Sequence, residues 1–307
     1  MLKTPLVSVL MSCYNGEKFI TSSVGSLISQ TYKNWELIFW DNFSTDLTPE
    51  IIKSFKDSRI KYYRATKHTK IGIAKNNALK LANGEYVAFC DVDDFWLKKK
   101  LELQIKELKK EDVSAVYSKY FIFNEKNSQI KKIIKKKNIN YPAGFIFNEV
   151  FESFLKSRPL VNNLTTLFRK KEILKLNEIF DENLHVAADF DFILRFSQTR
   201  KISFVNKYLA VYRVHSDNET SKNKNNQISE LEYWLLKNKN NEKISSNKNF
   251  LFLSNNIFYE RQKIYAYNRN VHSVVANLSK VDSIIKKIKI ILILILPRFI
   301  INKYFII

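Results

Sequence analysis

Three carboxylates lie within four positions of one short segment, FCDVDDFW at residues 89–96. They belong to Asp91, Asp93 and Asp94, directly after the apolar run 86–89. Like charges this close raise one another's pKa and cost stability. A divalent cation reverses that cost, and hard oxygen ligands suit Mg²⁺ or Mn²⁺, which complete their coordination with phosphate oxygens and water. The spacing therefore predicts a metal site that also takes a diphosphate.

A structural role is the alternative for part of this cluster. Asp93 or Asp94 could cap the N-terminus of a helix that begins at Phe95–Trp96. For Asp94 alone the cap is the preferred interpretation. For the cluster as a whole we favour the metal, because the preceding elements direct it to the edge of a sheet where ligands bind.

Strand-like and helix-like segments alternate through the first 90 residues. Apolar runs rich in β-branched and aromatic residues are separated by segments in which apolar residues recur every three or four positions. The expected strands are residues 7–12, 37–40, 59–64 and 86–90, and the expected helices are residues 20–28, 48–55 and 73–82. This alternation predicts an α/β fold with a doubly wound, mostly parallel, Rossmann-like sheet.

Polar residues follow the expected strands at one edge of that sheet. Ligands of doubly wound sheets bind in the crevice at the carboxyl ends of the strands. Those ends carry the segments 12–15, 41–42 and 91–94. The pattern predicts a ligand site at this edge before any family is considered.

The regular alternation loosens after residue 97. The expected elements there are a charged helix at 97–110, a strand near 113–117, an apolar helix around 147–155 and a strand-like segment at 164–168. The basic run 131–137 is expected to be a solvated loop. Residues 223–270 are rich in Asn and Lys and helical in character, without recognisable chemistry.

The composition indicates a globular protein with a polyanionic partner. The chain has 307 residues, 45% of them hydrophobic, and a net charge of +21. Nucleic acid, an anionic membrane and a phosphorylated substrate would all suit that charge, so it does not choose among them. Cys13 and Cys90 lie in apolar segments and are expected to be buried free thiols in a reducing cytosol. The apolar run 6–11 is expected to be a core strand rather than a cleavable signal.

Six stretches together resemble the inverting family 2 glycosyltransferases of the GT-A fold. They are PLVSVLMSCYNGEKFI (5–20), SLISQTYKNWELIFWDNFSTD (26–46), AKNNAL (74–79), NGEYVAFCDVDDFW (83–96), AADFDFILRF (187–196) and VYRVHS (211–216). They occur in the order usual for the family, and their joint occurrence is specific although each alone is weak. The resemblance implies a GT-A catalytic domain over 1–220, a helical C-terminal extension at 221–280 and a tail at 281–307.

The resemblance also implies which residues bind the nucleotide. They are Ser12, Tyr14, Asp41, Asn42, Lys75, Asp91 and Arg213. Ser12 and Tyr14 would line the nucleobase and ribose pocket, and Asp91 would contact the ribose. Lys75 stands where the family often has arginine, and Arg213 belongs to a segment that closes over the diphosphate.

The remaining implied residues are those of the metal and the proton transfer. Asp91 and Asp93 match the outer positions of the DXD motif, and Asp93 would hold Mn²⁺ or Mg²⁺. His215 either completes the metal shell or is an exposed surface residue, and the sequence favours neither. Asp189 matches the general base that deprotonates the acceptor hydroxyl.

This sequence departs from the family pattern at two positions. Asn42 replaces the second acid that reads the base, so an amide would face a uracil. Ala188 replaces the glutamate before Asp189, which leaves the expected base intact. Asp191 is a possible substitute for the base, but on a helix it would face away from Asp189, and solvation or a cap is its expected role.

The implied function is inverting, metal-dependent transfer from a nucleotide-diphosphate sugar, with a UDP-sugar favoured. A hexosyl or N-acetylhexosaminyl group would pass to a glycan or lipid-linked hydroxyl in bacterial cell-surface polysaccharide biosynthesis, at the inner face of the cell membrane. No nucleic acid is expected as a partner. Two alternatives stay open at this point: a nonenzymatic nucleic-acid-binding protein, and a degenerate transferase that acts as a scaffold.

The segment 281–307 combines apolar runs with basic residues. Its longest uncharged stretch, 290–297, has 8 residues, far below the roughly 20 that cross a bilayer. Flanking lysines and arginines are typical of an interfacial anchor attracted to anionic lipid. The tail is therefore expected to lie on a membrane surface, and packing on the protein's own core is the alternative.

Overall fold

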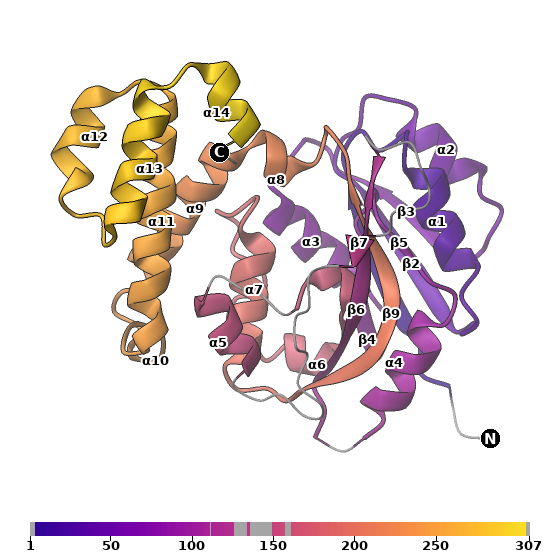
Figure 1. Cartoon of the computed structure of the whole chain (residues 1–307). Coiled ribbons are helices and arrows are strands. Elements are labelled where there is room, and N and C mark those ends of the chain that lie inside the picture. The colour runs from indigo at the N-terminus through magenta and orange to yellow at the C-terminus, as the bar shows by residue number, and fades with distance from the viewer. Residues whose placement is uncertain (1–3, 111, 126–133, 136–148, 157–160, 305–307) are drawn as a thin grey trace. The chain divides into compact units, whose positions relative to one another are not determined.

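The computed structural model describes residues 4–110, 112–125, 134–135, 149–156 and 161–304. The chain divides into two compact units, Met1–Phe154 with Pro159–Asn218, and Leu155–Arg158 with Glu219–Ile307 (Figure 1). Each unit has its own core and is described by itself.

The first unit is built on one mixed β-sheet. Among the described residues its nine strands follow the order β3-β2-β1-β4-β8-β6-β9-β5, with β7 paired to β6. The strands are β1 (Val7–Cys13), β2 (Trp35–Asp41), β3 (Ile60–Arg64), β4 (Tyr86–Phe89), β5 (Phe95–Trp96), β6 (Ala115–Asn124), β7 (Ile134–Lys135), β8 (Leu167–Arg169) and β9 (Ile202–Val214). The first four strands of that order are parallel, as the alternating pattern predicts.

Helices cover both faces of the parallel half. They are α1 (Ile20–Ile28), α2 (Thr48–Ser54) and α3 (Ile71–Lys80). The chain moves outward from β1 to β3 and then returns past β1 to β4. Right-handed crossovers therefore place α1 and α2 on one face and α3 on the other, as Figure 1 shows. The predicted α/β, doubly wound fold class is confirmed.

The core of this unit fills both faces of the sheet. All seven residues of β1 are buried, because a parallel central strand is covered on both sides. On one face Met11 and Phe39 belong to a cluster that includes Leu101 of α4 (Lys100–Leu108). On the other face an aromatic cluster forms around Phe89 and Phe192, whose ring centroids lie 5.9 Å apart.

The aromatic cluster positions helix α7 (Ala188–Ser197). Phe192 and Phe196 lie one helical turn apart on this helix and contact Phe168 of β8 at centroid distances of 5.4 and 5.1 Å. Phe180 stacks against Phe192 at 4.5 Å. These edge-to-face and tilted contacts hold the N-terminal turn of α7 near the carboxyl end of β4.

The second half of the unit differs from the sequence expectations. With 10 residues, β6 is twice as long as the strand expected at 113–117. The 13-residue strand β9 was not predicted, because its half-buried middle lacks a clean alternation. Phe95–Trp96 forms strand β5 instead of opening a helix. The segment 164–168 divides into a 3-10 turn, Asn163–Thr165, and β8.

Some expectations fall partly outside the described residues. Within the basic run 131–137 only β7 is described, and it pairs with β6. The expected helix at 147–155 corresponds to α5 (Glu149–Leu155). A short helix, α6 (Lys170–Ile173), follows β8.

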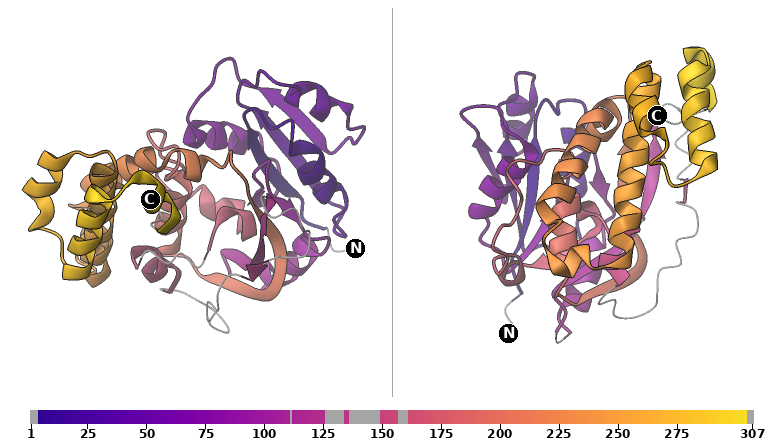
Figure 2. Two further views of the ribbon diagram at one scale, coloured as in Figure 1. Left: turned by 45° about the horizontal axis from the view of Figure 1, so that its top comes forward. Right: turned by 90° about the vertical axis from the view of Figure 1, so that its left-hand side faces the viewer.

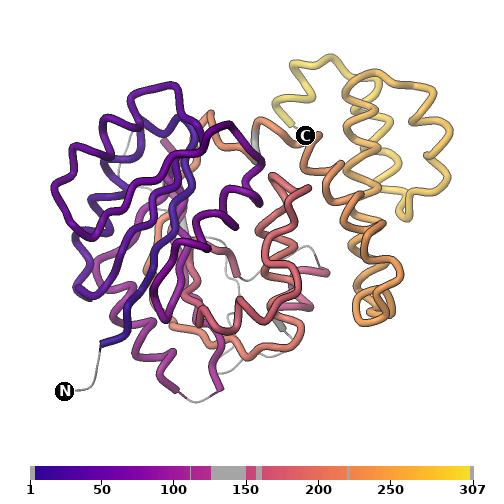
Figure 3. Tube along the Cα trace, turned by 180° about the vertical axis from the view of Figure 1, so that it is seen from behind, coloured from indigo at the N-terminus to yellow at the C-terminus, as the bar shows by residue number. Residues whose placement is uncertain are grey.

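The second unit is helical, as its Asn- and Lys-rich sequence suggested. Its helices are α8 (Glu219–Lys222), α9 (Lys224–Asn238), α10 (Glu242–Ser245), α11 (Lys248–Tyr267), α12 (Val271–Leu278), α13 (Ile284–Ile295) and α14 (Arg298–Tyr304). The long helices α9 and α11 run side by side (Figure 2), and α12 and α13 pack against α11 (Figure 3). In the described part of the chain, every helix is too short or too polar to cross a membrane.

Candidate active site

The carboxyl ends of β1, β2 and β4 bring the expected polar segments to one edge. Cys13 of β1 pairs with Asp41 of β2, and Leu10 of β1 pairs with Phe89 of β4, two residues before Asp91. Ser12 lies at the same level, and its buried hydroxyl has no hydrogen-bond partner within the described residues. An unsatisfied buried hydroxyl at the expected ligand edge is a group that a ligand can satisfy.

Tyr14 follows β1 and is half exposed beside an imidazole. The rings of Tyr14 and His68 lie 4.1 Å apart with an interplanar angle of 48°. No sequence motif marks His68, which lies in the polar segment between β3 and α3. Together the two rings form an aromatic surface next to Ser12, which suits a planar ligand.

Asn42 is occupied in holding the segment that carries His68. Its amide oxygen accepts hydrogen bonds from the Thr69 backbone nitrogen at 3.2 Å and hydroxyl at 2.8 Å. Its amide nitrogen donates to the Thr69 carbonyl at 2.7 Å. A nucleobase could bond this side chain only by displacing those partners, so Asn42 supports the aromatic surface rather than facing it.

Asp41 is fully buried, and both of its carboxylate oxygens are engaged. One oxygen accepts from the Ser44 backbone nitrogen at 2.7 Å, and the other accepts from the Tyr62 hydroxyl at 2.7 Å. Asp41 therefore fixes the turn after β2 and ties it to β3. The contact that we expected between Asp41 and the base would have to share oxygens that already accept these hydrogen bonds.

Lys75 and Asp189 form a buried ion pair across 114 positions of sequence. The ammonium of Lys75 lies 2.6 Å from Oδ1 of Asp189 and 3.8 Å from Oδ1 of Asp91. Burial alone would lower the pKa of Lys75, but the two carboxylates outweigh it and raise that pKa, so the lysine stays charged. Only 4% of its side chain is exposed, against 35% for Asp189.

Asp91 joins this pair to the metal-binding cluster predicted from the sequence. Loss of water around its carboxylate raises the pKa of Asp91 to about 6, against the opposing charge of Lys75. The carboxylates of Asp189 and Asp93 raise it further. The expected base and the expected ribose ligand thus share a single cation.

The α3 helix is clamped against the segment that leads into α7. The Ile71 backbone nitrogen donates to Nδ1 of His185 at 3.0 Å, and the Asn76 amide exchanges hydrogen bonds with the backbone of Phe180. A Cβ on Gly72 would lie 2.4 Å from the Asp181 carbonyl oxygen, so only glycine allows this approach. This clamp brings Lys75 to Asp189, and sequence analysis did not foresee it.

Asp93 and His215 meet with a third partner, Asn218. Nε2 of His215 lies 3.0 Å from Oδ2 of Asp93, and the Asn218 amide nitrogen lies 3.1 Å from the same oxygen. His215 is 7% exposed and packs on the Phe19 ring at 4.3 Å. The alternative of an exposed surface histidine is therefore wrong.

Asp93 and His215 together offer two donor atoms to a divalent cation. A carboxylate and an imidazole nitrogen converge on one point, which fits Mn²⁺ or Mg²⁺ if other positions go to diphosphate oxygens and water. In the residues that the structure describes, no group of three or more His, Cys, Asp and Glu side chains is placed to hold a metal. The protein alone would thus supply two ligands.

Asp94 and Arg213 have structural partners. Asp94 is buried, and its Oδ1 accepts from the Arg213 backbone nitrogen at 2.8 Å, which ties β9 to the acidic segment. Burial and the neighbouring carboxylates raise the pKa of Asp94 well above its usual value. Because Phe95–Trp96 is a strand, the expected helix cap at Asp94 is wrong.

The guanidinium of Arg213 lies over the rings of Phe19 and Phe95, at 5.1 and 5.5 Å from their centroids. It donates to Glu125 at 3.0 Å and to the Ser22 hydroxyl at 2.8 Å. These two hydrogen bonds use two of the five N–H groups of the guanidinium.

Asp191 differs from its expected role. It is buried, not solvated, and forms an ion pair with Arg195 one turn later on α7. The Arg195 side chain also bonds the Ile179 carbonyl oxygen at 2.7 Å, so the pair anchors α7 to the preceding segment. Both acids lie in the first turn of the helix, but Asp191 pairs with Arg195 and Asp189 pairs with Lys75.

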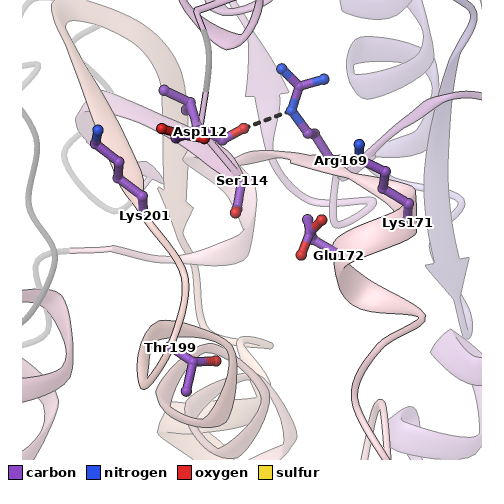
Figure 4. A pocket seen from close by; sticks show the side chains of 8 residues that line it. Asp112, Ser114, Arg169, Lys171, Glu172, Thr199 and Lys201 are labelled. Atoms are coloured by element: carbon purple, nitrogen blue, oxygen red, sulfur yellow. Dashed lines mark hydrogen bonds between the residues drawn. The ribbon is translucent and has the colours of Figure 1, made fainter.

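A hollow of about 470 Å³ lies at the opposite edge of the sheet. Figure 4 shows its polar lining, which includes Asp112, Arg169, Glu172 and Lys201. Nε of Arg169 donates to the Val113 carbonyl at 2.6 Å, so this side chain braces the loop before β6. These residues start β6 and β9 and end β8, which places the hollow away from the carboxyl ends of β1, β2 and β4.

Comparison with known sequences gives a family match over most of the first unit. The profile of Glycosyl transferase family 2 matches residues 8–220. An uncharacterized glycosyltransferase of Methanocaldococcus jannaschii is 32% identical over 275 residues, 87% of this chain and 88% of that protein. An Escherichia coli protein, UDP-Glc:alpha-D-GlcNAc-diphosphoundecaprenol beta-1,3-glucosyltransferase WfgD, is 41% identical over 136 residues, but the match spans only 53% of its length and 44% of this chain.

Solved structures share the fold. Staphylococcus aureus TarS 1-349 in complex with UDP-GlcNAc superposes with a TM-score of 0.64 at 21% identity, over 80% of this chain and 71% of that one. The mannosyltransferase PcManGT of Pyrobaculum calidifontis, in complex with GDP-Man and Mn2+, gives a TM-score of 0.57 at 18% identity, over 77% and 64%. The fold, the ligand edge and the profile match agree, and the chain belongs to glycosyl transferase family 2 and is a glycosyltransferase.

Proposed function

We propose that this glycosyltransferase transfers a sugar, with inversion, from a UDP-sugar to a hydroxyl of a glycan or lipid-linked acceptor. The observation that carries the proposal is the ion pair of Lys75 and Asp189 beside Asp91. It sets a partly exposed carboxylate next to the edge where polar groups of three parallel strands converge. Membership of the family makes the reaction class the natural use of this edge.

The donor nucleotide is assigned to the carboxyl ends of β1 and β4. The aromatic surface of Tyr14 and His68 would stack on the base, and the unsatisfied hydroxyl of Ser12 would bond it or the ribose. Asp91 would bond the ribose. The protein of similar fold that binds UDP-GlcNAc supports a uridine donor and a hexosyl or N-acetylhexosaminyl group.

Asp189 is assigned as the general base. Its carboxylate takes the proton of the acceptor hydroxyl while the oxygen attacks the anomeric carbon from the face opposite the diphosphate. The bond to the diphosphate breaks as the new bond forms, so the configuration inverts. Lys75 fixes the direction of the Asp189 carboxylate, because a buried ammonium at 2.6 Å leaves it little freedom.

Asp93 and His215 are assigned as the protein ligands of Mn²⁺ or Mg²⁺. A bound cation would neutralise charge that develops on the departing diphosphate. The structure of similar fold that contains GDP-Man and Mn2+ supports this assignment. Asn218 would orient the pair, since its amide contacts both side chains.

The acceptor is assigned to the class of lipid-linked saccharides. The name of WfgD refers to a diphosphoundecaprenol-linked GlcNAc. A putative teichuronic acid biosynthesis glycosyltransferase of Bacillus subtilis, TuaG, is 34% identical over 132 residues. Such an acceptor would suit a role in bacterial surface polysaccharide biosynthesis at the inner face of the cell membrane. The acceptor lipid would make membrane contact useful.

Replacing Asp189 by Asn tests the proposal. UDP-Glc and UDP-GlcNAc serve as donors and a synthetic GlcNAc-diphospho-lipid as acceptor. Asp189→Asn should reduce transfer by at least about a hundredfold and leave UDP affinity within about twofold by calorimetry, because a base acts only in the transition state. Asp57→Asn, at the amino end of β3, is the matched control and should keep both.

Two results would contradict the proposal. Near-normal turnover of Asp189→Asn would assign the base to another residue. Retained anomeric configuration in the wild-type product, read by proton NMR, would reject the inverting mechanism. Absence of transfer and of donor binding in the wild-type protein would instead favour the scaffold alternative.

A further inference from the structure

We propose that one face of α13 and α14 is a docking surface for an anionic lipid bilayer. The surface consists of Ile284, Ile288, Ile291, Ile295 and Phe299, with the basic residues beside them. The inference concerns the second unit alone and does not depend on the assignment of the active site. It rests on the division of these helices into a buried face and an exposed apolar face.

The buried face belongs to the core of the second unit. Ile290, Ile293 and Ile301 are fully buried, in one cluster with Ala266 and Val274 of the preceding helices. Polar contacts fix the same face: Lys286 donates to Asn256 of α11 at 3.2 Å. The segment is therefore no free tail, and the alternative of packing on the protein's own core holds for this half of it.

The opposite face of α13 exposes a stripe of large apolar side chains. Ile284, Ile288, Ile291 and Ile295 are 75%, 50%, 40% and 66% exposed. Their spacings of four, three and four residues keep them within about 60° of the helix circumference. Phe299 of α14 continues the apolar surface at 74% exposure. A row of exposed isoleucines is unusual on a protein that faces only water.

Basic side chains accompany the stripe and select its partner. Residues 281–307 contain five Lys and Arg and one Asp. On α13, Lys287 lies about 40° around the helix from Ile291 and Lys289 about 100° from Ile288, so the two flank the stripe on its two sides. Arg298 and Lys303 lie on α14. Apolar side chains flanked by cations match a bilayer surface, where acyl chains lie beneath anionic headgroups.

The dimensions of α13 favour docking along the surface. Its 12 residues span about 18 Å, well short of the roughly 30 Å of a bilayer core. A second copy of the chain is a poorer occupant, because a two-fold interface over this stripe would bring the basic side chains of both copies together. Nucleic acid would satisfy the lysines but would leave the isoleucines in water.

Vesicle co-sedimentation of the full chain tests the surface. The probe is a liposome of phosphatidylcholine with 30% phosphatidylglycerol, compared with phosphatidylcholine alone, at low and moderate salt. The triple variant Ile284→Gln, Ile288→Gln, Ile295→Gln should lose roughly tenfold or more of its partition onto the anionic vesicles. Gln preserves helix propensity, and circular dichroism should show unchanged helicity.

Two further variants make the test specific. Leu236→Gln, Leu251→Gln, Phe252→Gln removes three exposed apolar side chains from other helices of the same unit and should bind like the wild type. Lys287→Gln, Lys289→Gln should weaken binding roughly fivefold per lysine and reduce its dependence on salt.

Equal pelleting of the wild type, the isoleucine variant and the control would overturn the proposal. So would a wild-type protein that does not bind anionic vesicles and whose dimer, measured by light scattering, is broken by the isoleucine variant. That result would make the surface an interface between copies.

Discussion

At the scale of residues, the candidate site depends on one buried ammonium, that of Lys75, which two carboxylates share. Lys75 is the only described ammonium that the structure sets between the carboxylates of Asp189 and Asp91. The expected role for this lysine was a contact to the nucleotide. Its ammonium lies 2.6 Å from Asp189, the proposed base, and 3.8 Å from Asp91, the proposed ribose contact.

Lys75→Met should therefore lower kcat more than it changes donor affinity. Without the ammonium, Asp189 loses its fixed direction, and we expect kcat to fall by about tenfold or more. Lys75→Arg should restore part of the loss because it keeps the charge. Steady-state kinetics with both substrates, together with UDP calorimetry, separates the effects. Equal losses of kcat in the Met and Arg variants would argue that only the shape of the side chain matters.

The Asp93 and His215 pair predicts a metal-dependent donor affinity. Asp93→Asn or a chelator should each weaken UDP binding by roughly tenfold or more, because a cation held by Asp93 and His215 would attract the diphosphate. Uridine, which lacks a diphosphate, should bind the wild type and the variant alike and serves as the control. Calorimetry with and without Mn²⁺ measures this, and UDP affinity that ignores both changes would remove the metal from the site.

Lys100 predicts a pH dependence of stability outside the active site. Its ammonium is fully buried, donates to Gln104 at 2.7 Å and lies 4.1 Å from the Trp96 ring centroid. Burial lowers the pKa of Lys100 to about 7 from its usual 10.5. Between these values the unfolded chain binds the proton and the folded chain does not, so stability rises with pH across this window.

Lys100→Met should flatten that rise. The free energy of unfolding, from urea denaturation at pH 7 and pH 9.5, should increase more steeply with pH in the wild type than in the variant. The variant loses its hydrogen bond to Gln104, which costs about 1 kcal/mol at every pH. A pH slope identical in both proteins would show that Lys100 is not responsible.

At the scale of elements, the contact between α3 and the segment 180–185 brings Lys75 to Asp189, the proposed base. Gly72 allows the approach, and hydrogen bonds from Ile71 and Asn76 hold it. The aromatic contacts of Phe180 and Phe192 then fix α7. The position of Asp189, the proposed base, thus depends on packing rather than on a local motif.

Gly72→Ala should disturb this assembly, and Gly25→Ala supplies a matched control. A Cβ at Gly72 meets a backbone carbonyl at 2.4 Å, whereas nothing lies within 4 Å of one at Gly25 in α1. We expect Gly72→Ala to cost roughly 1–3 kcal/mol of stability and most of the activity. Gly25→Ala should stabilise by about 0.5–1 kcal/mol. Thermal unfolding and transfer assays measure both, and equal behaviour would refute the clamp.

At the scale of the whole molecule, the positive charge is divided between the two units, which we propose use it for different partners. Residues 219–307 carry fifteen Lys and Arg against six Asp and Glu, part of the net +21. The proposed lipid surface lies in this unit, and the proposed chemistry lies in the first. Because nucleotide binding and membrane docking would draw on separate units, they should respond to different substitutions.

The isoleucine variant of α13 should separate the two roles. With a GlcNAc-diphospho-lipid in anionic vesicles, KM for the acceptor should rise several-fold, since docking concentrates enzyme at the surface. With a short-chain, water-soluble analogue of the same acceptor, kcat/KM should stay within about twofold. Equal losses on both acceptors would mean that the substitutions damage the fold instead.

The sequence by itself determined the parallel half of the sheet and the family. Hydrophobic periodicity is a local property, so β1 to β4 and the helices between them follow from it with shifts of one or two residues. The acidic segment after β4 could be placed at the ligand edge because parallel strands end together. The second half of the sheet could not be predicted from the sequence, because β9 is half-buried and owes its length to pairing with the distant β6.

Only the tertiary structure decided what the polar side chains contact. Lys75 and Asp189 are 114 positions apart, and His215 and Asp93 are 122 apart. Tyr14 contacts His68, and Asn42 holds the segment of His68 through its hydrogen bonds to Thr69. Such partners depend on the paths of loops and on packing between distant elements, which no local pattern encodes. The two faces of α13 were likewise hidden in the sequence, because isoleucines buried against α11 and isoleucines open to solvent look the same until the helix is packed.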